Sequence, residues 1–197
     1  TSVFFFLTLP AQTGMVLLLV LLMGEITFIR HGQASFGRGD YDVLSETGRE
    51  QAALLARYLA DNGMRYDSVY CGTLNRHRDT ADPIADHLKN TGAVAVPGIT
   101  YADGLNEYHS EEIIHHYMPI VIAEDRSLAP LLEKIYTDRK SFQIIFERII
   151  AKWVAGEDQS DGVEGWAAFR LRVDEAVRSI INNSGRDGNV LVISSGG

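Results

Sequence analysis

The stretch that decides the fold is residues 25–35, which read Glu-Ile-Thr-Phe-Ile-Arg-His-Gly-Gln-Ala-Ser. Its first half, residues 26–29, is β-branched or aromatic and predicts a strand of a parallel sheet that is covered on both faces. Arg30, His31 and Gly32 follow at the carboxyl end of this strand, where ligands bind in open α/β sheets. Arginine and histidine beside a glycine suit an anion site, although the same residues can also end a strand as an ordinary polar loop.

The composition indicates a globular domain with one sizeable core. The chain has 197 residues, of which 46% are hydrophobic and 22% charged, and no internal repeat divides it. The net charge of −8 argues against broad binding of nucleic acid or anionic lipid, so local positive charge must meet an anionic substrate. The single cysteine, Cys71, excludes an internal disulfide and fits a reducing compartment, and we expect a cytoplasmic protein.

The first 22 residues form an apolar extension that we expect to lie outside the domain, which then spans residues 23–197. Its two apolar runs, residues 3–9 and 15–23, are each shorter than the roughly 18 to 20 residues of a membrane span. No Lys or Arg precedes Arg30, so the basic region of a signal peptide is missing. A signal segment or an anchor is one interpretation; an upstream extension from a misplaced start is the one we prefer.

Helical and strand patterns alternate along the first half of the chain. Residues 44–48 begin a helix with Ser45 as its N-cap, and an Asn-Gly pair at 62–63 ends it. A short strand at 68–70 precedes a second helix, in which Pro83 is expected to cause a kink or an interruption. A weak third strand is expected at 93–96 and a polar loop at 101–108.

The second half reads as helices followed by one buried strand. Ser110 begins a short helix that Pro119 is expected to end, and further helical patterns follow within 127–155 and 164–181. We interpret residues 117–161 as a helical insertion that carries specificity. Residues 190–193, Val-Leu-Val-Ile, predict a buried parallel strand. The Ser-Ser-Gly-Gly after it should lead into a covering helix, so we expect a three-layer α/β/α sandwich with a mainly parallel sheet, incomplete at its carboxyl end.

Six ordered motifs resemble the histidine phosphatase superfamily, in its phosphoglycerate-mutase-like group. They are Arg30-His31-Gly32-Gln33, Leu-Ser-Glu-Thr-Gly at 44–48, the segments 73–81 and 166–172, Leu105-Asn106-Glu107, and the strand with its Gly-Gly end at 190–197.

This resemblance implies a role for each charged residue of the motifs. His31 is expected to act as the nucleophile and to become transiently phosphorylated, because a neutral imidazole can attack phosphorus. Arg30 and Arg76 are expected to hold the phosphoryl oxygens, which match the donor fork of a guanidinium. Glu107 stands at the position of the proton donor that the leaving group needs; the alternative is an exposed loop glutamate.

Two positions depart from the pattern of the family. Members commonly carry a second histidine before the final glycines, where this chain has Ser195, whose hydroxyl can donate only a neutral hydrogen bond. Many members have an asparagine at the position of Gly37, for which Gln33 and Ser35 are the stand-ins toward phosphate. Ser195 therefore marks either a subgroup that supplies the charge elsewhere or an enzyme that is weak or inactive.

Other arrangements of reactive side chains fit less well. Residues 71–76 are one residue short of the cysteine phosphatase loop and lack its glycine-rich cradle. Of His109, His115 and His116, the adjacent two point to different helix faces, and no carboxylate spacing completes a site. We therefore expect a solvated surface and not a metal site. His77 is expected at the helix surface or behind the site.

We therefore expect a metal-independent phosphatase that needs no cofactor and hydrolyses a small-molecule or protein phosphomonoester through a phosphohistidine. A pseudophosphatase that binds a phosphorylated partner without turnover is the alternative, motivated by Ser195. A phosphoglycerate-type mutase is a third interpretation, which requires a phosphorylated resting state and a closed pocket. Neither a nucleic acid nor a membrane is expected as a partner.

Overall fold

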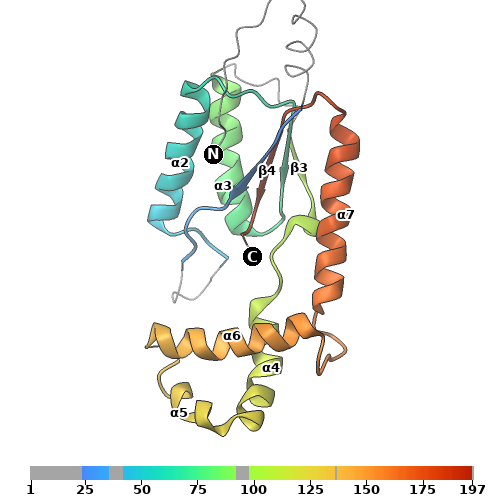
Figure 1. The fold of residues 1–197 in the computed structure, drawn as a ribbon. Coiled ribbons are helices and arrows are strands. Elements are labelled where there is room, and N and C mark those ends of the chain that lie inside the picture. Colours follow the sequence, from blue (N-terminus) through green and yellow to red (C-terminus); the bar gives the residue numbers. More distant parts are fainter. Residues whose placement is uncertain (1–23, 36–41, 92–97, 136, 197) are drawn as a thin grey trace, which may run out of the picture. The chain divides into compact units, whose positions relative to one another are not determined.

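The computed structural model describes residues 24–35, 42–91, 98–135 and 137–196 (Figure 1). The contacts divide the chain into two compact units. The first contains the described residues up to Asp103 together with Ser179–Ser195, and the second contains chiefly Gly104–Arg178. The predicted extension at 1–22, the predicted strand at 93–96 and Gly37 lie outside the described residues.

The helices and strands are, in chain order, β1 (Ile26–Arg30), α2 (Glu46–Asp61), β2 (Ser68–Cys71), α3 (Asn75–Asn90), β3 (Ile99–Tyr101), α4 (Ser110–Glu124), α5 (Ala129–Leu132), α6 (Arg139–Ala155), α7 (Trp166–Ser184) and β4 (Val190–Ser194).

The four strands form one parallel sheet in the first unit, in the order β1-β4-β2-β3 (Figure 1). β4 lies between β1 and β2, and its residues 190–193 are fully buried, as their unbroken apolar run predicts. The predicted α/β class with a parallel sheet is confirmed. The order of the strands brings the carboxyl ends of β1 and β4 next to each other, because parallel neighbours end at the same edge.

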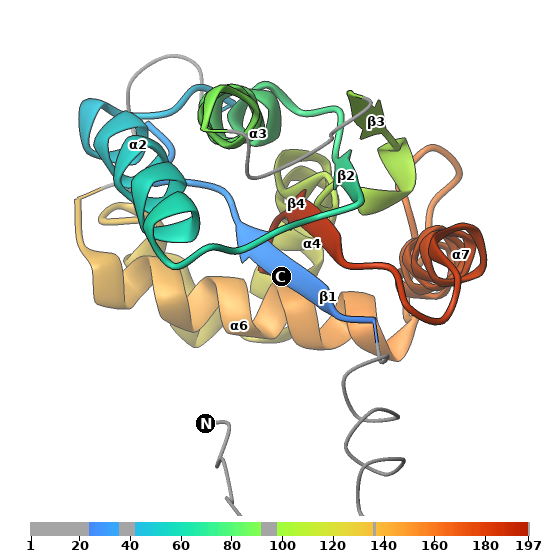
Figure 2. The ribbon, with the colours of Figure 1, turned by 90° about the horizontal axis from the view of Figure 1, so that it is seen from above.

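Helices α2 and α3 lie side by side over one face of this sheet (Figure 2). Ser45 caps α2 as predicted, with its Oγ accepting the N–H of Gly48 at 3.1 Å. The core of the unit lies between these helices and the sheet and contains Ala56, Leu59, Val69, Ala81, Ile84, Leu88, Leu191 and Ile193. The three core residues of α3 recur at helical spacing, so the periodicity in the sequence identifies the correct face.

The prediction that the first strand is covered on both faces is wrong. β1 lies at the edge of the sheet, where Ile29 packs against the core but Phe28, on the opposite face, is 55% exposed. Apolar residues on both faces of a strand therefore did not mean burial on both faces. Arg30 shares the exposed face with Phe28.

Neither Pro83 nor Pro119 interrupts its helix. α3 continues through Pro83 and α4 continues through Pro119. Both prolines are exposed. The carbonyl that loses its N–H partner four residues earlier can be solvated there, which lowers the cost of an interior proline.

A third strand, Ile99–Tyr101, lies between the strand predicted at 93–96 and the loop predicted at 101–108, and only Tyr101 overlaps that loop. β3 pairs with β2 in parallel, with Ile99 opposite Val69 and Tyr101 opposite Cys71. Its three residues, Ile-Thr-Tyr, are all good strand formers. The segment is too short for its alternation to be recognised beside the polar residues that follow.

The second unit is helical and has a core of its own. α6 crosses α4 (Figure 1), and Trp153 of α6 is buried against Tyr108, Trp166 and Phe169. Asp138 caps the start of α6, and Gly156, with a φ of 73°, ends it. The predicted helical insertion at 117–161 lies within this unit. No helix among the described residues is long and apolar enough to cross a membrane.

Two glycines allow the loop after β1 to lie directly on the first turn of α2. A Cβ at Gly32 would overlap the carbonyl oxygen of Gly48, and a Cβ at Gly48 would overlap the carbonyl oxygen of Gln33. The obstructing atoms are backbone atoms, which cannot move aside as a flexible side chain would. This close approach fixes the path of the chain immediately after His31.

Candidate active site

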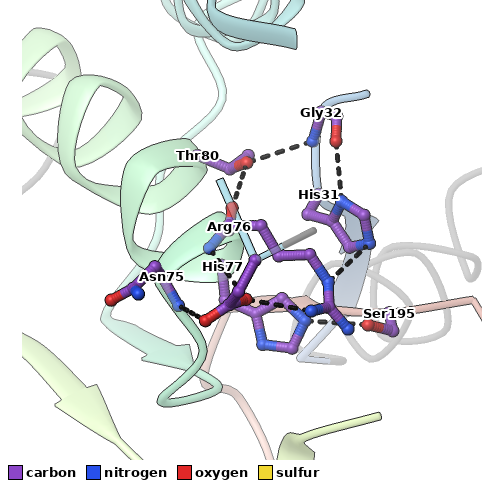
Figure 3. Close-up of polar contacts among 8 residues, drawn as sticks. His31, Gly32, Asn75, Arg76, His77, Thr80 and Ser195 are labelled. Carbon is purple, nitrogen blue, oxygen red and sulfur yellow. Dashed lines mark hydrogen bonds and ion pairs between the residues drawn. The ribbon is translucent and has the colours of Figure 1, made fainter. Parts of the chain in front are cut away.

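The candidate site lies where the carboxyl ends of β1 and β4 meet the amino end of α3 (Figure 3). Arg30 pairs with Ser194 across the two strands, and the backbone N–H of His31 donates to the carbonyl of Ser194 at 2.9 Å. His31 and Ser195 therefore follow paired residues on neighbouring strands. α3 begins four residues after β2, which brings Arg76 to the same edge.

The imidazole of His31 is held by two hydrogen bonds of opposite sense. Its Nδ1 lies 2.6 Å from the carbonyl oxygen of Gly32, which can only accept, so Nδ1 carries the proton. Its Nε2 accepts the Nε–H of Arg76 at 3.3 Å, so Nε2 carries the lone pair. The ring is 9% exposed. The predicted nucleophile is thus in the neutral form with Nε2 directed at the arginine.

Burial is the main cause that lowers the pKa of His31 below its usual value of 6.5. The positive charges of Arg76 and Arg30 lower this pKa further, while the bond to Gly32 and the charge of Asp42 oppose the shift. The neutral form therefore persists to lower pH than in a free imidazole. Arg30 is exposed, and its predicted nearness to His31 agrees with this electrostatic effect.

Arg76 is 6% exposed. It is held by Asp42, a residue that the sequence did not indicate as part of the site. The Nη1 of Arg76 and the Oδ1 of Asp42 form an ion pair at 2.9 Å. The same carboxylate accepts the backbone N–H groups of Asn75 at 2.8 Å and Arg76 at 3.4 Å. Asp42 thus satisfies donors at the start of α3, where a helix favours negative charge. Asp42 and Arg76 are 34 residues apart in the sequence, so no local sequence pattern predicts their contact.

The hydroxyl of Thr80 joins the His31 turn to α3. It accepts the N–H of Gly32 at 3.0 Å and donates to the carbonyl of Arg76 at 2.8 Å (Figure 3). Thr80 is buried. One side chain therefore fixes both the turn that holds Nδ1 of His31 and the turn that carries Arg76.

His77 is buried in the site. Of the two positions predicted for it, the one at the helix surface is therefore wrong. It is 0% exposed, its ring centroid lies 5.5 Å from that of His31, and its Nε2 lies 2.8 Å from the Oγ of Ser195. Burial, with the charge of Arg76 as a smaller cause, lowers the pKa of His77 to about 3. The ring is neutral at physiological pH.

Gln33 and Glu107 are two further residues that the sequence predicted for the site, and the hydrogen bonds at these positions are made with other residues. Gln33 is exposed; its backbone N–H donates to Gln51 Oε1 at 2.9 Å and its carbonyl accepts from Ser45. Glu107 belongs to the second unit, where it is half-buried. Arg172 donates to the carbonyl oxygens of Asn106 at 2.8 Å and Glu107 at 3.3 Å, so it fixes the segment that carries this carboxylate.

The alternatives to a histidine site are weakened. Burial is the main cause that raises the pKa of Cys71 to about 12, and its thiol donates to the carbonyl of Gly72. Such a thiol is a poor nucleophile. His116 lies 2.7 Å from the carbonyl oxygen of Asp158. Within the part of the chain that the structure describes, no three His, Cys, Asp or Glu side chains gather as metal ligands.

One family model matches nearly half of the chain. Residues 26–119 match the model of the histidine phosphatase superfamily (branch 1). The matched range contains four of the six motifs, with Arg30, His31, Arg76 and Glu107, and ends before Ser195.

Two curated phosphatases and one solved structure are similar to this chain. The mitochondrial serine/threonine-protein phosphatase Pgam5 of Caenorhabditis briggsae is 26% identical over 131 residues, which are 64% of this chain and 40% of that protein. The broad-specificity phosphatase YOR283W of Saccharomyces cerevisiae is 34% identical over 89 residues, which are 42% of this chain and 37% of that protein. The chain thus spans less than half of either relative.

The solved structure comes from Shigella flexneri and is described as an alpha-ribazole phosphatase. It matches with a TM-score of 0.51 and 21% identity, over 86% of this chain and 73% of that chain. At this identity the likeness establishes a shared fold alone.

Replacing Thr80 tests the hydrogen bond that supports the His31 turn. Thr80→Val keeps the shape of the side chain but leaves the buried N–H of Gly32 without its acceptor. We expect the free energy of unfolding to fall by about 1–3 kcal/mol, measured by urea denaturation. Thr80→Ser keeps the hydroxyl and loses one methyl group, which costs about 0.8 kcal/mol. A Thr80→Val protein as stable as the wild type would contradict this assignment.

Proposed function

Because the chain belongs to the histidine phosphatase superfamily, we propose that it hydrolyses phosphomonoesters through a phosphohistidine formed on Nε2 of His31. The observation that carries this proposal is the pair of opposed hydrogen bonds at the His31 ring. They support a neutral imidazole whose lone pair is directed toward a buried guanidinium. A nucleophile beside a fixed positive charge is what attack on a phosphoryl group requires.

In the first step, the Nε2 lone pair of His31 attacks phosphorus and the bond from phosphorus to the leaving oxygen breaks. Arg76 now donates to Nε2, so its guanidinium must turn to the phosphoryl oxygens when the ester binds. Arg30 lies on the edge strand and adds a second positive charge. Two guanidiniums stabilise the negative charge on the oxygens during transfer.

The leaving oxygen requires a proton, and the family resemblance assigns its supply to Glu107. In the second step, water attacks the phosphorus of the phosphohistidine, the carboxylate takes the proton of that water, and inorganic phosphate leaves. Nε2 of His31 regains its lone pair. In this scheme histidine supplies the nucleophile and arginines supply the charge, so the proposed reaction needs no metal or other cofactor.

The proposed substrate class is a small-molecule or protein phosphomonoester, and neither a nucleic acid nor a membrane is proposed as a partner. The net charge of −8 makes local recognition by the arginines necessary. One relative is described as a serine/threonine-protein phosphatase and another as a phosphatase of broad specificity, which supports both forms of substrate. We propose a cytoplasmic location from the free, buried thiol of Cys71, whereas the Pgam5 relative is described as mitochondrial.

Replacing His31 tests the proposed nucleophile. We expect His31→Ala to lower kcat for p-nitrophenyl phosphate by at least about 10³-fold, because the proposed covalent intermediate forms on the ring that this change removes. His115→Ala, at an exposed position on α4, is the matched control and should keep full activity. Unchanged turnover by His31→Ala would exclude the proposed mechanism.

Replacing Glu107 tests the proposed proton donor. Glu107→Gln keeps the size of the side chain and removes its acidity. We expect kcat to fall by about 10²-fold for an alkyl phosphate, whose leaving group needs a proton, and much less for p-nitrophenyl phosphate. Equal losses with both substrates would refute the role of Glu107 as an acid while leaving that of His31 intact.

A further inference from the structure

We propose that His77 is a positioning residue that orients the hydroxyl of Ser195 as a hydrogen-bond donor toward the phosphoryl group. This inference rests on the proposed function and concerns the same site. It addresses how a chain with serine in place of the second histidine can still supply a donor at that position.

The backbone places Ser195 next to the nucleophile. Arg30 and Ser194 are paired across β1 and β4, and the N–H of His31 donates to the carbonyl of Ser194 at 2.9 Å. Ser195 and His31 are therefore the first residues beyond two neighbouring strand ends. Figure 3 shows both with Arg76 and His77 at this edge. A phosphoryl group on Nε2 of His31 would form within this group of side chains.

The surroundings of His77 assign its tautomer. A neutral imidazole has one N–H and one lone pair. Its Nε2 lies 2.8 Å from the Oγ of Ser195, whereas its Nδ1 is buried and has no hydrogen-bond partner among the described residues. A buried N–H without an acceptor is the rarer and costlier arrangement. The single proton therefore belongs on Nε2, which donates to Ser195.

This tautomer determines what the hydroxyl can do. A serine hydroxyl has one proton and two lone pairs. When His77 donates to the oxygen, the proton of Ser195 remains available for another acceptor. The hydrogen bond from His77 also polarises the hydroxyl, since donors in a chain strengthen one another. An oxygen of the phosphoryl group is the acceptor that the proposed reaction brings to this position.

The same arrangement accounts for a buried histidine that takes no direct part in the proposed chemistry. Its ring is fully buried, and burial lowers the pKa of His77 to about 3, so it is neutral and a poor proton acceptor. His77 does not act as a base toward Ser195. His77 acts through the hydroxyl of Ser195 and does not itself contact the phosphoryl group that is transferred.

The first test measures the tautomers in the wild-type protein. With ¹⁵N-labelled histidine, long-range ¹H–¹⁵N spectra distinguish protonated from unprotonated ring nitrogens. We expect the proton of His77 on Nε2 and that of His31 on Nδ1, so the two rings are opposite references in one spectrum. A proton on Nδ1 of His77 would overturn the inference, because Ser195 would then donate to the ring.

The second test is a double-mutant cycle with amides that mimic different ring nitrogens. Asn places its amide near the position of Nδ1, while Gln reaches that of Nε2 and can still donate to Ser195. We expect His77→Asn to lower kcat for p-nitrophenyl phosphate about tenfold and His77→Gln to recover most of that loss. Ser195→Ala alone should cost about 10²-fold. In the Ser195→Ala protein, the two His77 variants should agree within a factor of about two.

A purely structural role for His77 predicts a different pattern. The loss from His77→Asn would then be the same with and without Ser195, and this additivity would overturn the inference. His87→Asn, the same substitution near the end of α3, is the matched control and should leave kcat unchanged. If His77→Asn does not fold, as judged by circular dichroism, the spectrum of the wild type decides the question.

Failure of the proposed function can be told apart from failure of this inference. His31→Ala is assayed in parallel, and turnover that survives it refutes the phosphohistidine whatever the cycle shows. If the protein binds inorganic phosphate without turnover, the cycle is measured on the Kd by calorimetry, and the same dependence on Ser195 is expected. A wild-type protein that neither turns over ester nor binds phosphate overturns both proposals.

Discussion

The site depends on the hydrogen bond from Nδ1 of His31 to the carbonyl oxygen of Gly32. This bond places the ring proton away from the site and leaves the lone pair on Nε2, where Arg76 donates to it. Its geometry requires the turn after β1 to be fixed. Thr80 holds the N–H of Gly32, and the close approach of Gly32 to Gly48 leaves no room for a side chain at either position. The parallel sheet and the first turns of α2 and α3 thus together position the imidazole of His31.

The charges of the site are fixed by contacts within the protein. Arg76 is buried and paired with Asp42, which also accepts two backbone N–H groups of α3. Burial and the nearby guanidiniums keep His31 neutral, so the groups that would bind an anion also favour the nucleophilic form of the ring. The neighbouring neutral pair of His77 and Ser195 adds a hydrogen-bond donor without adding charge.

Local patterns predicted the class of the fold, and the motifs pointed to two residues of the candidate site. The buried run of β4 and the Ser45 cap were identified because they depend on residues close in sequence. His31 and Arg76 were identified because the motifs carry them. The pairing of His77 with Ser195 spans 118 residues and depends on how α3 packs against the end of β4, which no local pattern encodes. Phe28 was misjudged because apolar residues do not reveal which strand lies at the edge.

The most direct test of the account is a rapid-quench reaction of the wild-type protein with ³²P-labelled aryl phosphate, followed by mapping of the labelled peptide. The account predicts an acid-labile, base-stable phosphoryl group on His31 at early times, which disappears as inorganic phosphate forms. Turnover with no label on His31, or with the label on another residue, would contradict it. Binding of the ester with neither label nor turnover would identify a phosphate-binding protein that is not an enzyme.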